Sequence, residues 1–308
     1  MFTLHTSSHL RFVRGGLGLC WVLLAMTLAA QAQTQADCTF NFFSTKTQFK
    51  HQDGTPVFMQ PLGINDFSTI VGYALFGTST ADSGLIRWAN GGVTRVKGTS
   101  ALVARNDHGT SVGWGLTLFE AILVNGTTIT PIVLDGNKMI LDGVEGINRW
   151  GTIVGTYHDN SGFPSVGHGF KRWNNGTTHT LDFPGATSSS TTPQGINDNG
   201  TVVGQYADNK ASLHGFIFHN GQWATLDYPQ AVATNLIGIT NAGKIIGKAR
   251  VTTPWSDILF LYENGTFKVI SVPNSVGPEL LSISPKQGLI LGITNDSPGS
   301  PAFIAQCQ

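Results

Sequence analysis

Short apolar runs that end in glycine recur along most of the chain, and they follow one recurring phrase of residues. Val, Ile and Thr are abundant, apolar and polar positions alternate, and no window has the 3.6-residue period of a capped helix. This pattern predicts an all-β chain. The phrase, Gly-Ile-Asn-x-x-Gly-Thr-Ile-Val-Gly in its regular form, occurs at Gly63–Gly72, Ala104–Gly113, Gly146–Gly155, Gly195–Gly204 and Gly238–Gly247, with a degenerate copy ending at Gly292.

The spacing of the copies predicts the architecture. Their closing glycines, at 72, 113, 155, 204, 247 and 292, lie 41, 42, 49, 43 and 45 residues apart, and about 40 to 50 residues is typical of a four-stranded propeller blade. Each copy predicts a short first strand, a tight turn, a second strand such as Thr201–Tyr206, an alternating third strand and a fourth strand such as Trp223–Tyr228 or Thr178–Phe183. An Asn-Gly pair, a strong hairpin signal, separates strands three and four at Asn90-Gly91, Asn125-Gly126, Asn175-Gly176, Asn220-Gly221 and Asn264-Gly265.

The two ends of the repeat region each hold part of a blade. The last copy has a third strand at Pro301–Gln306 but no fourth, whereas Thr39–Phe43 resembles a fourth strand without a third. Pairing them would complete a sixth blade and leave no unpaired sheet edge. Cys38 and Cys307 would then meet, and we expect a disulfide in place of the missing turn. The prediction is a six-bladed β-propeller of four-stranded blades over residues 33–308, closed by its N-terminal strand.

The first 32 residues have the features of an export signal. Two arginines precede an apolar run, Leu17–Ala30, and Ala30-Gln31-Ala32 supplies small residues for cleavage. The run is shorter than the ~20 residues that span a bilayer. We therefore predict a signal peptide at residues 1–32 and a secreted bacterial protein, extracellular or periplasmic, with no membrane span after cleavage.

Charge narrows the expected partners. The sequence has 18 basic and 18 acidic residues, and cleavage removes two arginines, which leaves 16 against 18 and a net charge of −2. Since only 12% of residues are charged, no basic surface for nucleic acid is expected. We expect a monomer whose partner is an extracellular glycan or protein. No cysteine, histidine or aspartate spacing indicates a metal site, and no cofactor is expected.

The repeated residues resemble the HAF family of extracellular repeats, named for a His-Ala-Phe-like triplet. The matching positions are His168-Gly169-Phe170 and His214-Gly215-Phe216, with a partial match at Ala302-Phe303. Leu-Asp-aromatic-Pro elements at Leu181–Pro184 and Leu226–Pro229 fit the same family. The resemblance covers nearly all of the mature chain. It implies export and a repeat fold, but no established reaction and no catalytic residues.

Longer connections follow the second and fourth strands, and both kinds lie on one face of an up-and-down blade. Ligand-binding residues collect on such loops, here expected at Phe76–Gly84, Asp159–Gly167, Gly185–Pro193 and Val251–Asp257. An aromatic residue follows the closing glycine in several copies, and burial between blades is the alternative explanation for these side chains. A His-Asp pair is expected in one connecting loop. The candidate ligand-binding residues are Tyr73, Trp114, Tyr157, His158, Asp159 and Tyr206.

No nucleophile elbow, phosphate loop or metal-protease motif is present. His168 and His214 are expected to build the repeat, and Asp182 and Asp227 to form turns. The sequence therefore predicts a secreted, non-catalytic binding or scaffold propeller. One alternative is a glycan-active hydrolase or lyase with its site in the central funnel, and another is a structural role in the envelope or matrix. The carboxylates to consider for the enzyme are Asp142, Glu145, Asp159 and Asp208.

Overall fold

A computed structural model describes residues 34–50, 54–75, 83–117, 120–134, 139–159, 167–187, 190–252, 255–295 and 299–308. The chain divides into two compact units, residues 1–32 and 33–308, and the predicted signal peptide lies outside the described residues. All regular structure in the described part consists of β-strands, which confirms the all-β prediction. No helix in that part is long and apolar enough to cross a membrane.

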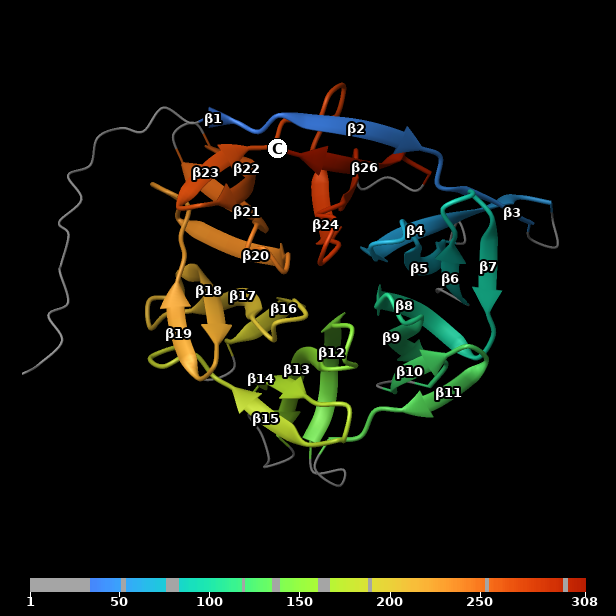
Figure 1. Ribbon diagram of the computed structural model, residues 1–308, viewed down its shortest axis with the longest axis horizontal. Coiled ribbons are helices and arrows are strands. Elements are labelled where there is room, and N and C mark those ends of the chain that lie inside the picture. Colours follow the sequence, from blue (N-terminus) through green and yellow to red (C-terminus); the bar gives the residue numbers. More distant parts are fainter. Residues whose placement is uncertain are drawn as a thin grey trace, which may run out of the picture. The chain divides into compact units, whose positions relative to one another are not determined.

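Strands β4 to β23 form five antiparallel units of four consecutive strands, one for each of the first five copies of the repeat. The first strand of each unit lies toward the centre and the fourth toward the rim, in a propeller-like arrangement (Figure 1). The units are β4 (Pro56–Ile64), β5 (Ile70–Leu75), β6 (Gly84–Arg87) and β7 (Val93–Val96); β8 (Thr99–Arg105), β9 (Thr110–Gly115), β10 (Ala121–Asn125) and β11 (Thr128–Pro131); β12 (Met139–Ile147), β13 (Ile153–Asp159), β14 (Gly167–Arg172) and β15 (Thr178–Leu181); β16 (Thr192–Ile196), β17 (Val202–Ala207), β18 (Leu213–His219) and β19 (Gln222–Thr225); and β20 (Ala233–Ile239), β21 (Ile245–Thr252), β22 (Trp255–Glu263) and β23 (Thr266–Val269).

The last copy forms three strands, and a strand from the other end of the described chain adds a fourth. In the resulting sheet, β2 pairs antiparallel with β26 from Cys38 opposite Cys307 to Phe43 opposite Ala302. The two remaining strands are edge strands of other sheets. β1 pairs parallel with β23, and β3 pairs antiparallel with β4. These strands are β24 (Glu279–Ile283), β25 (Ile290–Ile293), β26 (Ala302–Cys307), β2 (Cys38–Phe43), β1 (Thr34–Gln35) and β3 (Lys46–Lys50).

Hydrogen bonding groups the strands into five sheets instead of the six separate blades that the sequence predicts. Two units, β16–β19 and β20–β23, share one nine-stranded sheet because a single parallel pair, Leu213 opposite Ala233, joins β18 to β20. Each of these units keeps its own antiparallel order. Their backbones therefore touch at one end without merging into one blade.

Two expected loops are partly strand. Most of the Val251–Asp257 connection belongs to β21 and β22, whose ladder extends to Thr252 opposite Trp255. The predicted His158-Asp159 loop lies at the end of β13, where His158 pairs with Gly167 of β14. Extended pairing satisfies backbone groups that a loop would leave to water, so the ladders run further than the glycine pattern suggested. The fourth strands are shorter than expected, since β19 ends at Thr225.

The closing glycine of each copy leaves room for a neighbouring strand. A Cβ on Gly204 would lie 2.1 Å from the carbonyl oxygen of Thr192 and 2.9 Å from the ring of Phe216. Phe216 lies opposite Gly204 on the third strand and is fully buried. The same cross-strand pairing joins Gly155 to Phe170. The repeated glycine and the repeated phenylalanine are thus one packing device, in which an aromatic ring covers the backbone of a glycine.

A buried asparagine directly after the first strand connects each of the first four units to the next. In Asn148, the side-chain oxygen accepts hydrogen bonds from the backbone N–H groups of Trp150 and Thr152, at 3.1 and 3.0 Å. The amide nitrogen donates across the boundary to the carbonyl oxygen of Asn197, at 3.1 Å. One side chain therefore shapes its own turn and holds the neighbouring turn. The equivalent cross-boundary donors are Asn65 to Asn106, Asn106 to Asn148 and Asn197 to Thr240.

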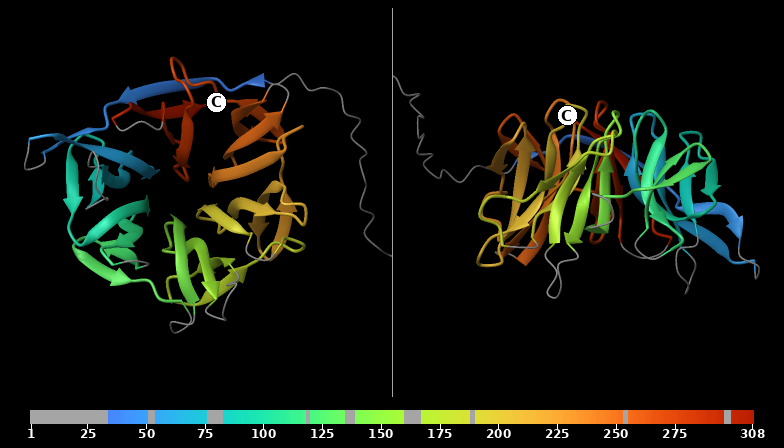
Figure 2. Two further views of the ribbon diagram at one scale, coloured as in Figure 1. Left: turned by 180° about the vertical axis from the view of Figure 1, so that it is seen from behind. Right: turned by 90° about the horizontal axis from the view of Figure 1, so that it is seen from below.

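The first and last repeats are joined at the same level. The carboxylate of Asp66 accepts hydrogen bonds from the backbone N–H groups of Lys286 and Gln287, at 2.9 and 2.8 Å. These groups are more than 200 positions apart in the sequence. We call the end of the domain that carries these turns the tight-turn face, and the opposite end, which carries the connections after the second and fourth strands, the wide-loop face. Figure 2 shows the strands running between these two faces.

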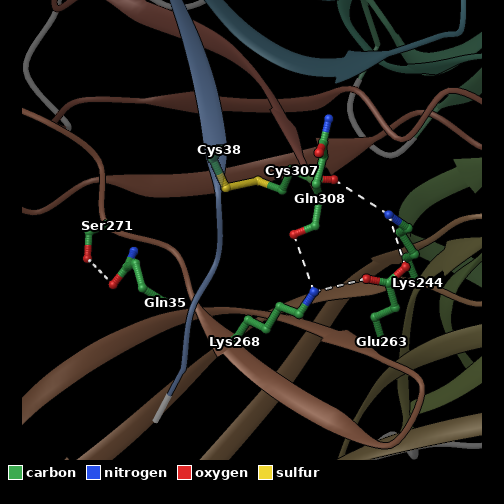
Figure 3. The surroundings of a disulfide bond; sticks show 8 residues. All are labelled: Gln35, Cys38, Lys244, Glu263, Lys268, Ser271, Cys307 and Gln308. Atoms are coloured by element: carbon green, nitrogen blue, oxygen red, sulfur yellow. Dashed lines mark hydrogen bonds and ion pairs between the residues drawn. A yellow bond between two sulfur atoms is a disulfide. The ribbon is translucent and has the colours of Figure 1, made fainter.

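A disulfide links Cys38 to Cys307, with Cα atoms 4.1 Å apart. Figure 3 shows the surrounding polar contacts. Lys244 donates to the carbonyl oxygen of Cys307, and Lys268 donates to that of Gln308. Both ammonium groups also pair with Glu263, at 3.0 and 3.3 Å. The final residues are therefore held by the neighbouring β20–β23 unit as well as by β2.

We predict that Asn148→Ala destabilises the fold by about 2–4 kcal/mol, because it leaves buried backbone N–H and carbonyl groups without a partner. Asn148→Thr should cost less, since the chain itself has Thr240 at the equivalent place and its hydroxyl accepts from Lys244 N–H. Urea denaturation measures both changes. The matched control is Asn175→Ala, an exposed residue that caps a local turn. Equal losses at positions 148 and 175 would contradict the cross-boundary role.

We also predict that replacing both Cys38 and Cys307 by serine lowers the unfolding free energy by about 5 kcal/mol in the chain-entropy model, since the disulfide closes a loop with a sequence separation of 269. The native far-UV circular dichroism spectrum should persist because the β2–β26 hydrogen bonds do not need the sulfur atoms. Guanidinium denaturation of the oxidised protein and the double variant tests this. An unchanged midpoint would show that the disulfide adds nothing to the paired strands.

Candidate functional site

The first strand of each repeat carries a β-bulge at the same place, and this strand lies toward the centre of the propeller-like arrangement (Figure 1). Four of these bulge residues, Glu145, Gln194, Ile237 and Leu281, line a central cavity of about 60 Å³. That space accommodates a few water molecules, and it is too small for a sugar ring. In the remaining two first strands, the bulges place Leu62 and Val103.

Glu145 is the one acidic residue among these bulge positions. Its side chain is accessible to water in the cavity, yet protein atoms surround it on most sides, so the carboxylate is poorly solvated. This burial raises the pKa of Glu145 to about 7. At neutral pH the group is therefore divided between its protonated and charged forms.

A polar ring surrounds the cavity at the tight-turn face. Asp107 accepts a hydrogen bond from the backbone of Asp66, Asp198 accepts one from Arg149, and Asn241 accepts one from Asp198. Burial would raise the pKa of Asp66, but the N–H groups of Gln287 and Lys286 outweigh it and lower that pKa. For Asp107, burial and the neighbouring Asp66 raise the pKa above its usual value. These carboxylates hold turns together and are largely occupied.

His-Asp pairs recur at the wide-loop face. His168 Nδ1 lies 2.8 Å from Asp182 Oδ2, and His214 Nδ1 lies 2.7 Å from Asp227 Oδ2. The expectation that the two aspartates only form turns was incomplete, because each anchors the histidine of its own repeat. Burial alone would lower the pKa of His214, but hydrogen bonds and charge from Asp227 and Asp208 raise it.

The aromatic candidates at this face do not form a common site. Tyr157 and Tyr206 are buried, and their hydroxyl groups hydrogen-bond to Thr180 and Thr225, at 2.7 and 2.9 Å. The ring of Tyr206 also stacks on His214, with centroids 5.2 Å apart. These two tyrosines are therefore core residues that pack between neighbouring units, with the ring of Tyr206 stacked on Phe183 of the preceding unit at 3.7 Å between centroids. Burial between blades was the alternative explanation for them.

The remaining candidates lie in separate places. Tyr73 in β5 and Trp114 in β9 are half-buried and belong to different sheets. His158 lies 2.5 Å from Asp142 within its own sheet, and Asp159 is the last residue of β13. Much of the wide-loop surface, including the expected loops at 76–82 and 160–166, lies outside the described residues.

An open pocket of about 520 Å³ lies instead on the tight-turn face, between the β4–β7 and β8–β11 units. Phe67, in the turn after β4, has 64% of its surface exposed, and Trp88, after β6, has 39%. Arg105, at the end of β8, places its guanidinium 5.6 Å from the centre of the Trp88 ring. The rest of the lining includes Asp107 and His108. Exposed aromatic rings beside hydrogen-bonding groups are typical of ligand-binding surfaces.

The equivalent boundary between β12–β15 and β16–β19 is built differently. It carries the aromatic residues Trp150 and Trp173 at the corresponding positions. The indole N–H of Trp150 donates to the carbonyl oxygen of Asp198, and Lys171 donates to that of Gly200, both at 2.9 Å. These two bonds hold the unit that carries the aromatic residues against the turn of the next unit. The boundary between the β4–β7 and β8–β11 units has no counterpart of these two bonds among the described residues, and the open pocket lies there.

The pattern of loops and recurring residues along the sequence does not indicate this pocket. A signal was present in the repeat itself. The second copy has Arg105 where the other copies have isoleucine, at Ile64, Ile147, Ile196, Ile239 and Ile283. Within the described part of the chain, no three His, Cys, Asp or Glu side chains gather closely enough to hold a metal ion.

No family model and no curated protein matches this chain. Solved structures with a similar course of the chain include an oligogalacturonate lyase in complex with manganese, at 10% identity and a TM-score of 0.47, covering 89% of this chain and 98% of that one. A six-bladed fungal lectin from Aleuria aurantia that recognises fucose has 10% identity and a TM-score of 0.43, with 79% and 93% covered. YCF48 bound to D1 peptide has 13% identity and a TM-score of 0.41, with 89% and 99% covered. These values carry no argument about function.

We predict that Glu145→Gln flattens the pH dependence of stability. The folded-state pKa of about 7 lies above the ordinary value of 4.5, so the folded protein binds this proton more tightly. Its stabilising contribution is complete below about pH 4.5 and is lost as the pH rises through about 7. The variant should therefore gain stability relative to the native protein at about pH 8.

Urea denaturation at about pH 5 and about pH 8 measures this change. The control is Ile237→Val, which alters the same cavity wall without a titrating group and should shift stability equally at both pH values. An unaltered pH dependence in Glu145→Gln would contradict the raised pKa.

Proposed function

We propose that the mature protein is a closed six-bladed propeller. Three contacts between the chain ends support this: the β2–β26 ladder, the disulfide, and the hydrogen bonds from Lys286 and Gln287 to Asp66. The nine-stranded sheet counts as two blades, because a single residue pair joins its two antiparallel units. Membership of the HAF repeat family and export through a signal peptide at residues 1–32 are part of the same proposal. A disulfide suits an oxidising compartment outside the cytosol.

We further propose that this propeller binds a saccharide outside the cell without converting it. The carrying observation is the open pocket between two blades, where Phe67 and Trp88 present exposed aromatic faces beside Arg105. Sugar rings have apolar faces that pack on aromatic rings, while their hydroxyl groups take hydrogen bonds from polar neighbours. The His-Asp pairs do not compete with this interpretation, because each fastens strands of one blade.

A glycan-active enzyme is the second candidate, and Glu145 is the observation in its favour. A carboxyl group with a pKa of about 7 suits general acid catalysis. The cavity beside it holds only about 60 Å³, so a sugar ring would have to remain at the mouth. A glycosidase also needs a second carboxylate across the scissile bond. Asp107 and Asp198 at that mouth are engaged in turn contacts, which favours binding over turnover.

We predict that the purified mature protein binds saccharides on a glycan array, and that Trp88→Ala weakens this binding roughly tenfold or more through the lost stacking surface. Trp173→Ala is the matched control, because it removes the same side chain at the equivalent place of a boundary that carries the Trp150 contact. Retention of full binding by Trp88→Ala, or binding to proteins alone, would contradict the proposal. Chromatography of the array hits after incubation would reveal products if the enzyme candidate were correct.

A further inference from the structure

Arg105 departs from the rule of its own repeat. The five other copies have isoleucine at this position, and all five isoleucines are buried near the centre, whereas the second copy has a partly buried arginine. Burial lowers the pKa of Arg105, which reflects the cost of keeping a charge in a place built for an apolar side chain. An arginine is more costly to bury here than the isoleucine of the other copies, and this cost calls for an explanation.

The guanidinium of Arg105 is only partly used by the protein. It donates one hydrogen bond to the Ser111 hydroxyl, at 2.9 Å, and it contacts the ring of Trp88. No ion pair joins it to a carboxylate among the described residues. An arginine has five N–H donors in a planar fork that fits a carboxylate with two parallel hydrogen bonds. Arg105 therefore retains donors at the pocket.

The carboxylates near this pocket do not supply the missing partner. Asp107 accepts from the backbone of Asp66 and from the ammonium of Lys286, at 3.1 and 3.3 Å, and its side chain is only 6% exposed. Asp66 in turn accepts from the backbone of Lys286 and Gln287. The acidic groups of the wall are thus buried and paired. The groups left to face a ligand are donors and aromatic rings, together with the imidazole of His108 in the same lining.

From this arrangement we propose that the pocket binds a saccharide with a carboxylate group, a uronic acid, whose ring stacks on Trp88 and Phe67 and whose carboxylate is held by Arg105. This inference rests on the saccharide-binding function proposed above. A hexuronic acid carries its carboxylate directly on the sugar ring. One ligand can therefore meet the aromatic faces and a guanidinium that lies 5.6 Å from the Trp88 ring centre.

The test compares matched pairs of oligosaccharides that differ only at the sixth carbon. Calorimetric titration of the mature protein would compare three pairs of hexasaccharides with the same linkage within each pair. The pairs are β-1,4-linked mannuronate and mannose, glucuronate and glucose, and galacturonate and galactose. We expect at least one uronate to bind about tenfold more tightly than its neutral partner, as a charge-assisted bidentate pair allows. This preference should fall with added salt, because the pocket is open to solvent.

Variants at Arg105 test the assignment of the carboxylate. Arg105→Ile installs the residue of the other five copies and should fold, as far-UV circular dichroism can check. It should reduce uronate affinity to that of the neutral hexamer. Arg105→Lys should keep part of the preference, because it retains the charge and loses the fork. The control Lys171→Ile removes the positive charge that lies 5.5 Å from the centre of the Trp173 ring at another boundary, and it should leave uronate affinity unchanged.

The outcomes separate this inference from the function on which it rests. If neutral hexamers bind as tightly as uronates and Trp88→Ala abolishes both, the saccharide-binding function stands and the carboxylate assignment fails. A preference for uronates that survives Arg105→Ile, or stronger binding of a sulfated neutral sugar, would also overturn the assignment. If no saccharide binds, both proposals fail together.

Discussion

A buried asparagine amide after four of the six repeated first strands is the interaction on which the packing of neighbouring units depends. An amide group accepts at one end and donates at the other, and this chain uses both ends for different tasks. The oxygen of Asn197 caps its own turn at Asn199 and Thr201, while the nitrogen reaches Thr240 of the next unit. Because these groups are buried, leaving any of them unpaired is costly. Local turn geometry and the placement of the neighbouring unit are therefore coupled.

Where the asparagine is replaced, other contacts take over. Thr240 and Ser284 keep the accepting oxygen for their own turns but have no amide to extend. Between the fifth and sixth repeats, the backbone N–H of Asn241 donates to the carbonyl oxygen of Pro285. Between the sixth and first repeats, Asp66 accepts hydrogen bonds from the backbone N–H groups of Lys286 and Gln287. The disulfide and the β2–β26 ladder add a second connection at the rim. The most degenerate repeat is thus the one whose sheet contains a covalent bond.

Residues that repeat build the fold, whereas the charged side chains of the candidate sites are departures from the repeat. The His-Gly-Phe triplet shows the first half of this rule. His214 bonds to Asp227, a Cβ on Gly215 would lie 2.4 Å from the carbonyl oxygen of Leu226, and Phe216 covers the closing glycine. A His-Asp pair that looks catalytic in isolation is here a strand fastener. Arg105 and Glu145 show the second half, since each puts a charge where the other copies mostly have an apolar side chain.

Periodicity alone determined the strand order, the repeat boundaries and the pairing of two distant cysteines. Those features follow from local rules: alternation, turn residues at fixed spacing, and the need of a sheet edge for a partner. The sequence could not show that Asn148 reaches Asn197, or that Phe183 of the preceding unit covers Tyr206. It also could not show that Phe67, Trp88 and Arg105 line one pocket between two units. Contacts between blades depend on how far each twisted sheet turns relative to the next, and no spacing along the chain encodes that rotation. Only the tertiary structure could therefore decide which face carries an open pocket.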